Sequence, residues 1–254
     1  MRAAATLLPV LTLAAMALAW EGVVYFGLIA EFWISRPSDI GAWLWRELVR
    51  GDVLWMHIWV TLAGTLLGFA LGSGLGVVAG YLFARNRWLY LAFDPLLVAL
   101  YSMPRVALAP LFILWFGLGI LSKVAIAVSL VFFVLLLNTY NGYRSVDQDL
   151  VNAIRTTGAS RRFVARRVIL PSCLPWVFAG MRASIGLALI GTTVGEMIGS
   201  QYGIGLVIAR ASGTFDTAAI FGGLVIVAAM GLALTRAVEL VESRLFRWRV
   251  EVVT

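Results

Sequence analysis

Two ionisable side chains, Arg105 and Glu196, lie within long apolar stretches of this chain. An ionisable side chain near the centre of a bilayer costs about 2.5–3.5 kcal/mol on insertion scales, so it normally faces a cavity or a partner. The sequence therefore predicts that both residues face a polar pathway through the protein. Other possibilities stay open: either residue has a structural role, the two side chains pair with each other, or Glu196 lies at the outer interface, where the cost is small.

Three hydroxyl side chains are weaker candidates for the same pathway. They are Ser102, Thr192 and Thr193. Hydroxyl groups in membrane helices often bond to their own backbone, so their presence alone does not define a polar route. We include them in the predicted pathway beside Arg105 and Glu196.

The other reactive residues support neither catalysis nor metal binding. Cys173 is the only cysteine and cannot form an internal disulfide, and His57 is the only histidine and cannot build a site of several histidines. No acidic pair lies within a predicted span, and no Gly-x4-Gly-Lys-Ser/Thr motif is present. We predict no catalytic residue, no metal and no cofactor in this chain, and we interpret His57 and Cys173 as packing residues.

The composition indicates a membrane protein. Of the 254 residues, 61% are hydrophobic and only 13% are charged, far from the balance of a soluble domain. The net charge is +7, which in a soluble protein would suggest nucleic acid. Here the arginines stand at the ends of apolar runs, so we interpret them as signals of membrane topology.

The apolar runs predict an all-α polytopic membrane protein with six transmembrane helices. The first run is expected to be an uncleaved span; the alternative, signal-peptide cleavage near Ala17–Ala19, would leave five spans. Residues 88–143 are expected to cross twice, with an outer turn at 117–123 that contains the only lysine, Lys123. The predicted spans cover residues 6–34, 55–83, 88–143 (two crossings), 174–198 and 217–240, with an irregular segment at 199–216.

Three local patterns refine this picture. Residues 37–50 predict a short interfacial helix with Ser38 or Asp39 as its N-cap. The third helix is expected to be kinked or broken because of its prolines. In the second span, glycine recurs at every fourth residue, which places one small-residue face against another helix. These glycines are Gly64, Gly68, Gly72, Gly76 and Gly80.

Arginine clusters predict that both termini are cytoplasmic. The longest polar stretch, residues 144–171, has a large excess of arginine and is assigned to the cytoplasm. The further arginines that support this topology are Arg85, Arg87, Arg244, Arg247 and Arg249.

Within that stretch, residues 147–171 predict two short helices. Asp147 and Ser160 are expected N-caps, Gly158 supplies the tight backbone between the helices, and Pro171 is expected to stop the second one. The first helix offers a modest apolar ridge, which indicates a docking surface for a partner. The ridge consists of Leu150, Ala153, Ile154 and Thr157. The alternative is a basic amphipathic loop that lies on anionic lipid.

The loop resembles the signature of importer permeases, in which Glu-Ala-Ala, three residues, Gly, nine residues, Ile, one residue and Leu-Pro form helices that dock on a cytoplasmic ATPase. The residues that the resemblance assigns to ATPase coupling are Asn152, Ala153, Ile154, Gly158, Ala159, Val168, Leu170 and Pro171. Three positions depart from the signature: Asn152 replaces the glutamate, Ile154 the second alanine and Val168 the isoleucine. The loss of the glutamate weakens any specific salt bridge to the ATPase.

The resemblance extends over residues 55–249 to the nitrate/sulfonate/taurine permease family of ABC importers. It rests on Asp94-Pro95, the run Met103–Leu111, Leu114–Gly117 and Gly195–Ile198. It implies the type I ABC importer permease fold, divided into a first span with an outer interfacial helix (1–50), a transmembrane domain (51–249) and a cytoplasmic tail (250–254).

The same resemblance implies a transport subunit of a bacterial inner membrane rather than an enzyme. Its partners would be separate ATPase subunits that carry ATP and Mg²⁺, a periplasmic or lipid-anchored solute-binding protein, a second permease copy in a homodimer, and membrane lipid. The solute would be small, and nitrate, taurine, other sulfonates, bicarbonate, and neutral or aromatic molecules stay open. The positive charge of Arg105 favours an anion. A passive channel and a membrane anchor that recruits a cytoplasmic partner stay open as alternatives.

Overall fold

The computed structural model describes residues 2–245 of the chain, and throughout this range the regular structure is helical. The predicted tail 250–254 and the topology residues Arg247 and Arg249 lie outside the described residues. The helices are α1 (Arg2–Tyr25), α2 (Pro37–Val49), α3 (Val53–Arg85), α4 (Arg87–Ser102), the 3-10 helix η1 (Arg105–Leu108), α5 (Ala109–Phe116), α6 (Ile120–Arg144), α7 (Gln148–Thr156), α8 (Arg161–Val164), the π-helical turn η2 (Ala165–Ile169), α9 (Leu170–Ile198), α10 (Ile204–Thr214) and α11 (Thr217–Leu245).

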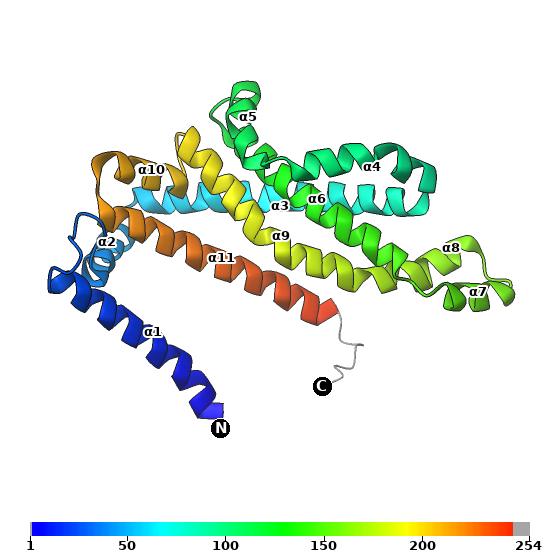
Figure 1. Ribbon diagram of the computed structural model, residues 1–254, viewed down its shortest axis with the longest axis horizontal. Helices are drawn as coiled ribbons and strands as arrows, with labels where there is room; N and C mark the ends of the chain where they lie inside the picture. The colour runs from blue at the N-terminus through cyan, green and yellow to red at the C-terminus, as the bar shows by residue number, and fades with distance from the viewer. Residues whose placement is uncertain (1, 246–254) are drawn as a thin grey trace.

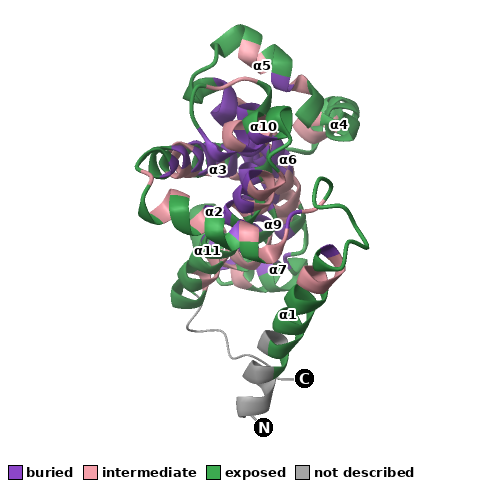
Figure 2. Cartoon of the chain, turned by 90° about the vertical axis from the view of Figure 1, so that its left-hand side faces the viewer, coloured by how far each residue is buried: buried purple, intermediate pink, exposed green. Residues whose placement is uncertain are grey.

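The long helices α3, α6, α9 and α11 form the body of the molecule (Figure 1). At one end of this bundle lie α2 and α10, and at the other end lie α7 and α8. Helix α1 diverges from the bundle and contacts it through α2 and through Trp20, whose ring lies edge-on to Phe221 of α11. Buried residues gather where α3, α6, α9 and α10 meet, while α1 and α4 are mostly exposed (Figure 2). An exposed apolar helix surface is expected where lipid is the solvent.

Within residues 2–245, four helices are long and apolar enough to cross a membrane: α3, α6, the continuous helix Arg161–Ile198, and α11. The bent pair formed by α4 and the segment Arg105–Phe116 makes a fifth crossing if it is counted as one broken span. These findings confirm the predicted all-α polytopic class. The first predicted span corresponds to α1, of which the segment Leu11–Tyr25 is an apolar helix shorter than the four long ones. The count of six transmembrane helices therefore stays a prediction.

The third crossing is broken, as the prolines predicted. Its two halves meet at an angle of 85°. The break falls at Met103-Pro104, where Met103 is extended (φ −71°, ψ 140°), because the residue before a proline avoids the helical region. Pro95 lies inside α4 without ending it, and Pro110 lies in the first turn of α5, where a missing N–H costs nothing.

Helices α3 and α6 approach closely along the glycine face of α3. All five glycines at the four-residue interval are buried. A Cβ added at Gly72 would lie 2.8 Å from the Cβ of Val131, and one added at Gly76 would lie 2.7 Å from the Cβ of Leu135. Because no methyl group fits at these positions, α6 packs directly on the backbone of α3.

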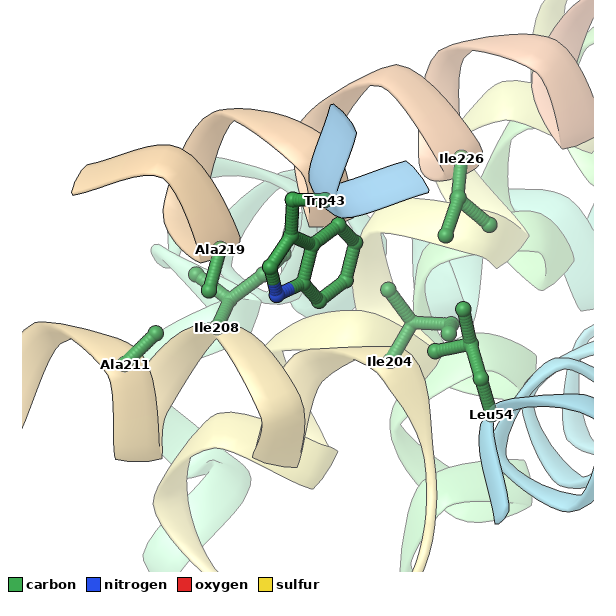
Figure 3. Packing of buried hydrophobic residues seen from close by; sticks show 7 residues of the cluster. All are labelled: Trp43, Leu54, Ile204, Ile208, Ala211, Ala219 and Ile226. Atoms are coloured by element: carbon green, nitrogen blue, oxygen red, sulfur yellow. The ribbon is translucent and has the colours of Figure 1, made fainter. Parts of the chain in front are cut away.

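An apolar cluster joins four elements at the α10 end of the bundle (Figure 3). Trp43 of α2 lies at its centre, against Gly222 of α11, where an added Cβ would collide with the indole ring. The cluster consists of Trp43, Leu54, Ile204, Ile208, Ala211, Ala219 and Ile226. The interfacial helix predicted at 37–50 is therefore anchored to the bundle through its tryptophan.

Three local expectations were wrong. The segment 199–216, predicted to be irregular, contains the helix α10. Helix α6 begins at Ile120, so Lys123 lies in its first turns and is 3% exposed instead of standing in an outer turn. Helix α2 begins at Pro37 with Arg36 as N-cap, because Ser38 instead donates its hydroxyl to Glu21 of α1 at 2.8 Å.

The glycine face gives a test of the packing. Gly76→Leu should separate α3 from α6 and destabilise the protein by at least about 1–3 kcal/mol, the usual cost of overpacking. Gly74→Leu is the matched control, because an added Cβ at exposed Gly74 meets nothing within 4 Å. Thermal unfolding followed by size-exclusion chromatography in detergent would compare them. Equal stability of the two variants would contradict the close approach.

Candidate functional site

The first residues of α10 are held by side chains from two other helices. The backbone N–H of Gly203 donates to Nδ1 of His57 at 2.8 Å, that of Ile204 to the hydroxyl of Thr61 at 2.9 Å, and that of Gly205 to a carboxylate oxygen of Glu196 at 2.9 Å. The opening N–H groups of a helix have no partner within it. His57, Thr61 and Glu196 therefore cap α10 in place of a side chain of its own.

The three capping groups converge because of where their helices place them. His57 and Thr61 are four residues apart on α3 and lie on one face of that helix. Glu196 lies in the last turn of α9 and is completely buried. The Thr61 hydroxyl donates its single proton to the Glu196 carboxylate at 2.8 Å. With a lone pair, the same oxygen accepts the hydrogen bond from the Ile204 N–H.

Glycine is required where α10 meets this cluster. Gly203 has φ +127°, a conformation that L side chains rarely adopt, and an added Cβ would collide with the Glu196 carboxylate. At Gly205 an added Cβ would collide with the Thr193 carbonyl oxygen. The two glycines thus allow the carboxylate to reach the backbone of the helix start.

The Glu196 carboxyl group lies at a helix N-terminus, where it accepts a backbone hydrogen bond. Negative charge at a helix N-terminus is stabilising by about 0.3–1 kcal/mol, and by up to about 2 kcal/mol in partly buried sites. The ammonium of Lys123 interacts electrostatically with the carboxylate and donates to the Tyr202 carbonyl at 3.2 Å. Glu196 therefore has a structural task as the cap of α10, and its predicted role in the pathway stays a prediction.

Arg105 lies apart from this cluster, at the bend between α4 and α5. Its guanidinium lies 5.1 Å from the ring centroids of both Tyr101 and Phe133, and it donates to the Ser129 carbonyl at 3.4 Å. Its Nε is buried without a hydrogen-bond partner within residues 2–245. Arg105 and Glu196 each have their own contacts, so the structure does not show the pairing that the sequence left open.

The three hydroxyl candidates differ in their surroundings. Ser102 is exposed and donates to the carbonyl of Val98 at 2.8 Å, a bond to its own helix. Thr192 and Thr193 are buried on α9, and their hydroxyls lack a hydrogen-bond partner within the described part of the chain. Thr192 packs where α9 crosses Gly64 of α3. The structure thus does not gather these hydroxyls around Arg105.

The α7–α8 loop has a small core of its own. Asp147 caps α7 by accepting from Asp149 N–H at 2.8 Å, and Ser160 caps α8 by accepting from Phe163 N–H at 3.2 Å, as expected. Between the two helices Gly158 has φ +81°. The buried side chains of the loop are Val146, Val151, Val164, Val168 and Cys173. Val168, which the resemblance assigned to coupling, therefore packs inside the loop.

The outward side of this loop carries apolar groups. Leu150 is 49% exposed and Phe163 is 51% exposed. Ala153, which follows Leu150 on α7, is also exposed. Asn152 and Gly158 are exposed as well, while Ile154 is half-buried. A fixed inner core thus supports an accessible, partly apolar outer surface.

The expectation that Pro171 ends the second helix of the loop was wrong. Helix α8 continues through the π turn into α9, so Arg161–Ile198 is one helix of 38 residues. Proline in a regular α-helix clashes with the carbonyl four residues earlier. The wider π turn directly before Leu170-Pro171 rearranges the local hydrogen bonds and lets the helix continue.

These features define a helical membrane protein with a broken third crossing and a structured loop at one end of its bundle. Residues 72–247 match the family described as the binding-protein-dependent transport system inner membrane component. The chain belongs to this family and is an ABC importer permease subunit.

Several curated relatives agree with this assignment. The riboflavin transport system permease protein RibX of Chloroflexus aurantiacus is 37% identical over 95% of this chain and 89% of its own length. The putative aliphatic sulfonates transport permease protein SsuC of Bacillus subtilis is 35% identical over 91% of this chain and 83% of its own. The formylaminopyrimidine transport permease protein ThiX of Halalkalibacterium halodurans is 35% identical over 78% and 79%.

A solved structure shows the same fold. A chain of the MetNI methionine ABC transporter in an inward-facing conformation aligns with a TM-score of 0.63 at 20% identity, over 74% of this chain and 96% of that chain. The predicted type I importer permease fold is therefore confirmed.

Sequence reasoning missed most of the capping cluster. His57 was interpreted as a packing residue, and Thr61 was not singled out. One signal was available: His57 and Thr61 continue the small-residue face of α3, since the buried positions 57, 61, 64 and 68 recur at helical spacing. Polar groups on a closely packed face need partners across it.

Thr61→Val should lower stability because it removes the acceptor of Ile204 N–H and the donor to Glu196 at nearly constant volume. A loss of about 1.5–3 kcal/mol is expected for a hydrogen bond to a charged group. Thr65→Val is the matched control, since Thr65 is equally buried but bonds only to its own helix at Thr61 O. Thermal unfolding in detergent would compare the two, and an equal loss in both variants would contradict the capping role.

Proposed function

We propose that the α7–α8 loop, residues 147–171, is the surface through which this permease subunit couples to separate ATPase subunits. The observation that carries the proposal is the exposed apolar side of the loop, with Leu150, Ala153 and Phe163, above a buried core of its own. Because a core of its own supports it, this surface can be displaced by a bound partner without unfolding. In this arrangement ATP and Mg²⁺ are bound by the ATPase, and this chain hydrolyses nothing.

The coupling role sets the orientation of the chain. The α7–α8 end of the bundle faces the cytoplasm, together with Arg85 at the end of α3 and Arg244 at the end of α11, in agreement with the excess of arginine there. The α2 and α10 end then faces outward, where a solute-binding protein delivers its cargo. A second copy of this chain completes the pathway as a homodimer.

The solute is proposed to be small and anionic, of the sulfonate type. Arg105 supports this assignment because its guanidinium is only half-buried, lies at the bend of the broken crossing and keeps an unpaired Nε. A relative 35% identical to this chain is named for aliphatic sulfonates, while others are named for riboflavin and formylaminopyrimidine. Taurine carries a sulfonate group and nitrate is a small anion, so both fit the same requirement for a positive charge.

The coupling proposal predicts a specific loss of ATPase binding. Ala153→Arg adds a long charged side chain to an exposed position of α7, so the chain should fold normally but retain at least tenfold less ATPase on co-purification. Ser243→Arg is the control, because it adds the same charge at an exposed position near the end of α11. Unchanged co-purification of Ala153→Arg would return the loop to a lipid-facing role and favour the anchor alternative.

The solute proposal predicts a charge requirement at Arg105. In vesicles with the assembled importer, Arg105→Ala should reduce ATP-driven uptake of a sulfonate at least tenfold, while Arg105→Lys, which keeps the positive charge, should reduce it less. Uptake of riboflavin by the same vesicles is the comparison. Equal sulfonate uptake by all three proteins would refute an anion contact, and uptake without ATP would favour a passive channel.

A further inference from the structure

A basic cleft lies beneath the α7–α8 loop, where the loop meets the ends of α3 and α6. Its volume is about 480 Å³. Five arginines line it: Arg85 from the end of α3, Arg155 from α7, and Arg161, Arg162 and Arg166 from α8 and the π turn. Tyr81 and Tyr143 complete the polar lining with their phenol groups.

Within residues 2–245, no acidic side chain forms an ion pair with an arginine of this cleft. The ion pairs of this range join Arg36 to Glu31, Arg182 to Glu242 and Arg236 to Glu239. Like charges held close together repel one another, and an anion between them removes that repulsion. Guanidinium groups bind phosphate oxygens through paired hydrogen bonds.

The cleft also has an apolar side that faces the spans. Ile169 and Leu170 line it where the π turn joins α9, and Leu170 is 44% exposed. Arg85 is the last residue of the span α3, so the arginines stand at the level where a span leaves the hydrocarbon. Charged groups at the headgroup level, above apolar groups at the level of the acyl chains, match the two parts of a phospholipid.

We propose that this cleft binds the phosphate headgroup of an anionic phospholipid of the inner leaflet. Basic pockets between transmembrane helices on the cytoplasmic side suit such headgroups. The proposal rests on the proposed function for its cytoplasmic orientation. A lipid in the cleft would join α3 to the coupling loop, because Arg85 belongs to the former and Arg155, Arg161 and Arg162 to the latter.

The test measures thermal stabilisation of the purified full chain in neutral detergent, without ATPase, as a function of added lipid. Phosphatidylglycerol should raise the unfolding midpoint, whereas phosphatidylcholine, which has no net charge, and inorganic phosphate should not. The double variant Arg85→Gln, Arg162→Gln should need at least tenfold more phosphatidylglycerol for the same shift. Equal stabilisation by inorganic phosphate would instead show that the cleft binds free phosphate, and it would overturn the proposal of a lipid site.

A matched control removes the same charge from the same end of the bundle. Arg144→Gln, Arg167→Gln changes two exposed arginines that do not line this cleft, and it should respond to phosphatidylglycerol like the wild type. An equal loss in both double variants would overturn the site in favour of diffuse attraction. If the glutamine pair fails to fold, Arg85→Lys, Arg162→Lys keeps the charge and should weaken the response; an unchanged response would overturn the site.

Co-purification with the ATPase separates this proposal from the coupling role. Lipid-dependent stabilisation without ATPase binding would leave the lipid site standing and reject the coupling role. Normal lipid response in the Arg85→Gln, Arg162→Gln variant, together with loss of the ATPase, would show that the cleft receives the partner protein and would overturn the lipid assignment.

Discussion

The first backbone N–H groups of α10 need acceptors from elsewhere in the chain, and the packing at the α2–α10 end of the bundle depends on how these acceptors are supplied. A backbone N–H that is buried without an acceptor costs about as much as a lost hydrogen bond, and the first N–H groups of a helix have no partner within it. Here His57, Thr61 and Glu196 supply the acceptors. Helices α3, α9 and α10 must therefore hold one fixed arrangement, because moving any of them breaks at least one of these bonds.

The glycine face of α3 is what makes that arrangement compatible with close packing. Gly64 lets α9 approach through Thr192, and Gly72 and Gly76 let α6 approach along the rest of the helix. Small residues allow backbones to approach in a membrane, where lipid offers apolar side chains an equally good solvent. Trp43 then packs against α10 and joins helix α2 to the same end of the bundle. Small side chains bring the helices together, and polar side chains fix their positions.

Local patterns in the sequence predicted the features that depend on local chemistry. The break at Met103-Pro104 follows from proline geometry, and the caps at Asp147 and Ser160 follow from side chains that bond to their own backbone. Helix α10 was missed because it is only 11 residues long and its capping groups come from distant parts of the chain. Isolated helices of that length are marginal, so tertiary contacts decide whether they form.

The same reasoning explains two further errors. Lys123 was placed in a turn because a charged residue near glycines favours one, but its partner is the carbonyl of Tyr202, 79 residues further along the chain. Pro171 was expected to stop a helix because the sequence does not reveal the π turn that accommodates it. Sequence also placed Arg105 and Glu196 in one category, as charges within apolar runs. Only the fold separates a cap from a half-buried guanidinium beside two rings.

The continuity of Arg161–Ile198 gives the molecule a direct mechanical connection from end to end. One end of this helix contributes Phe163 and its neighbours to the α7–α8 loop, and the other end carries Glu196, which caps α10. A helix is stiff along its axis, so a displacement of the loop must either be absorbed at the π turn or be carried to the Glu196 end. The π turn is the weaker point, because π-helical hydrogen bonding is rare and is usually confined to single turns. The helix thus combines a deformable segment next to the loop, where Pro171 and Pro175 follow the π turn, with a far end that is fixed to α3 and α10.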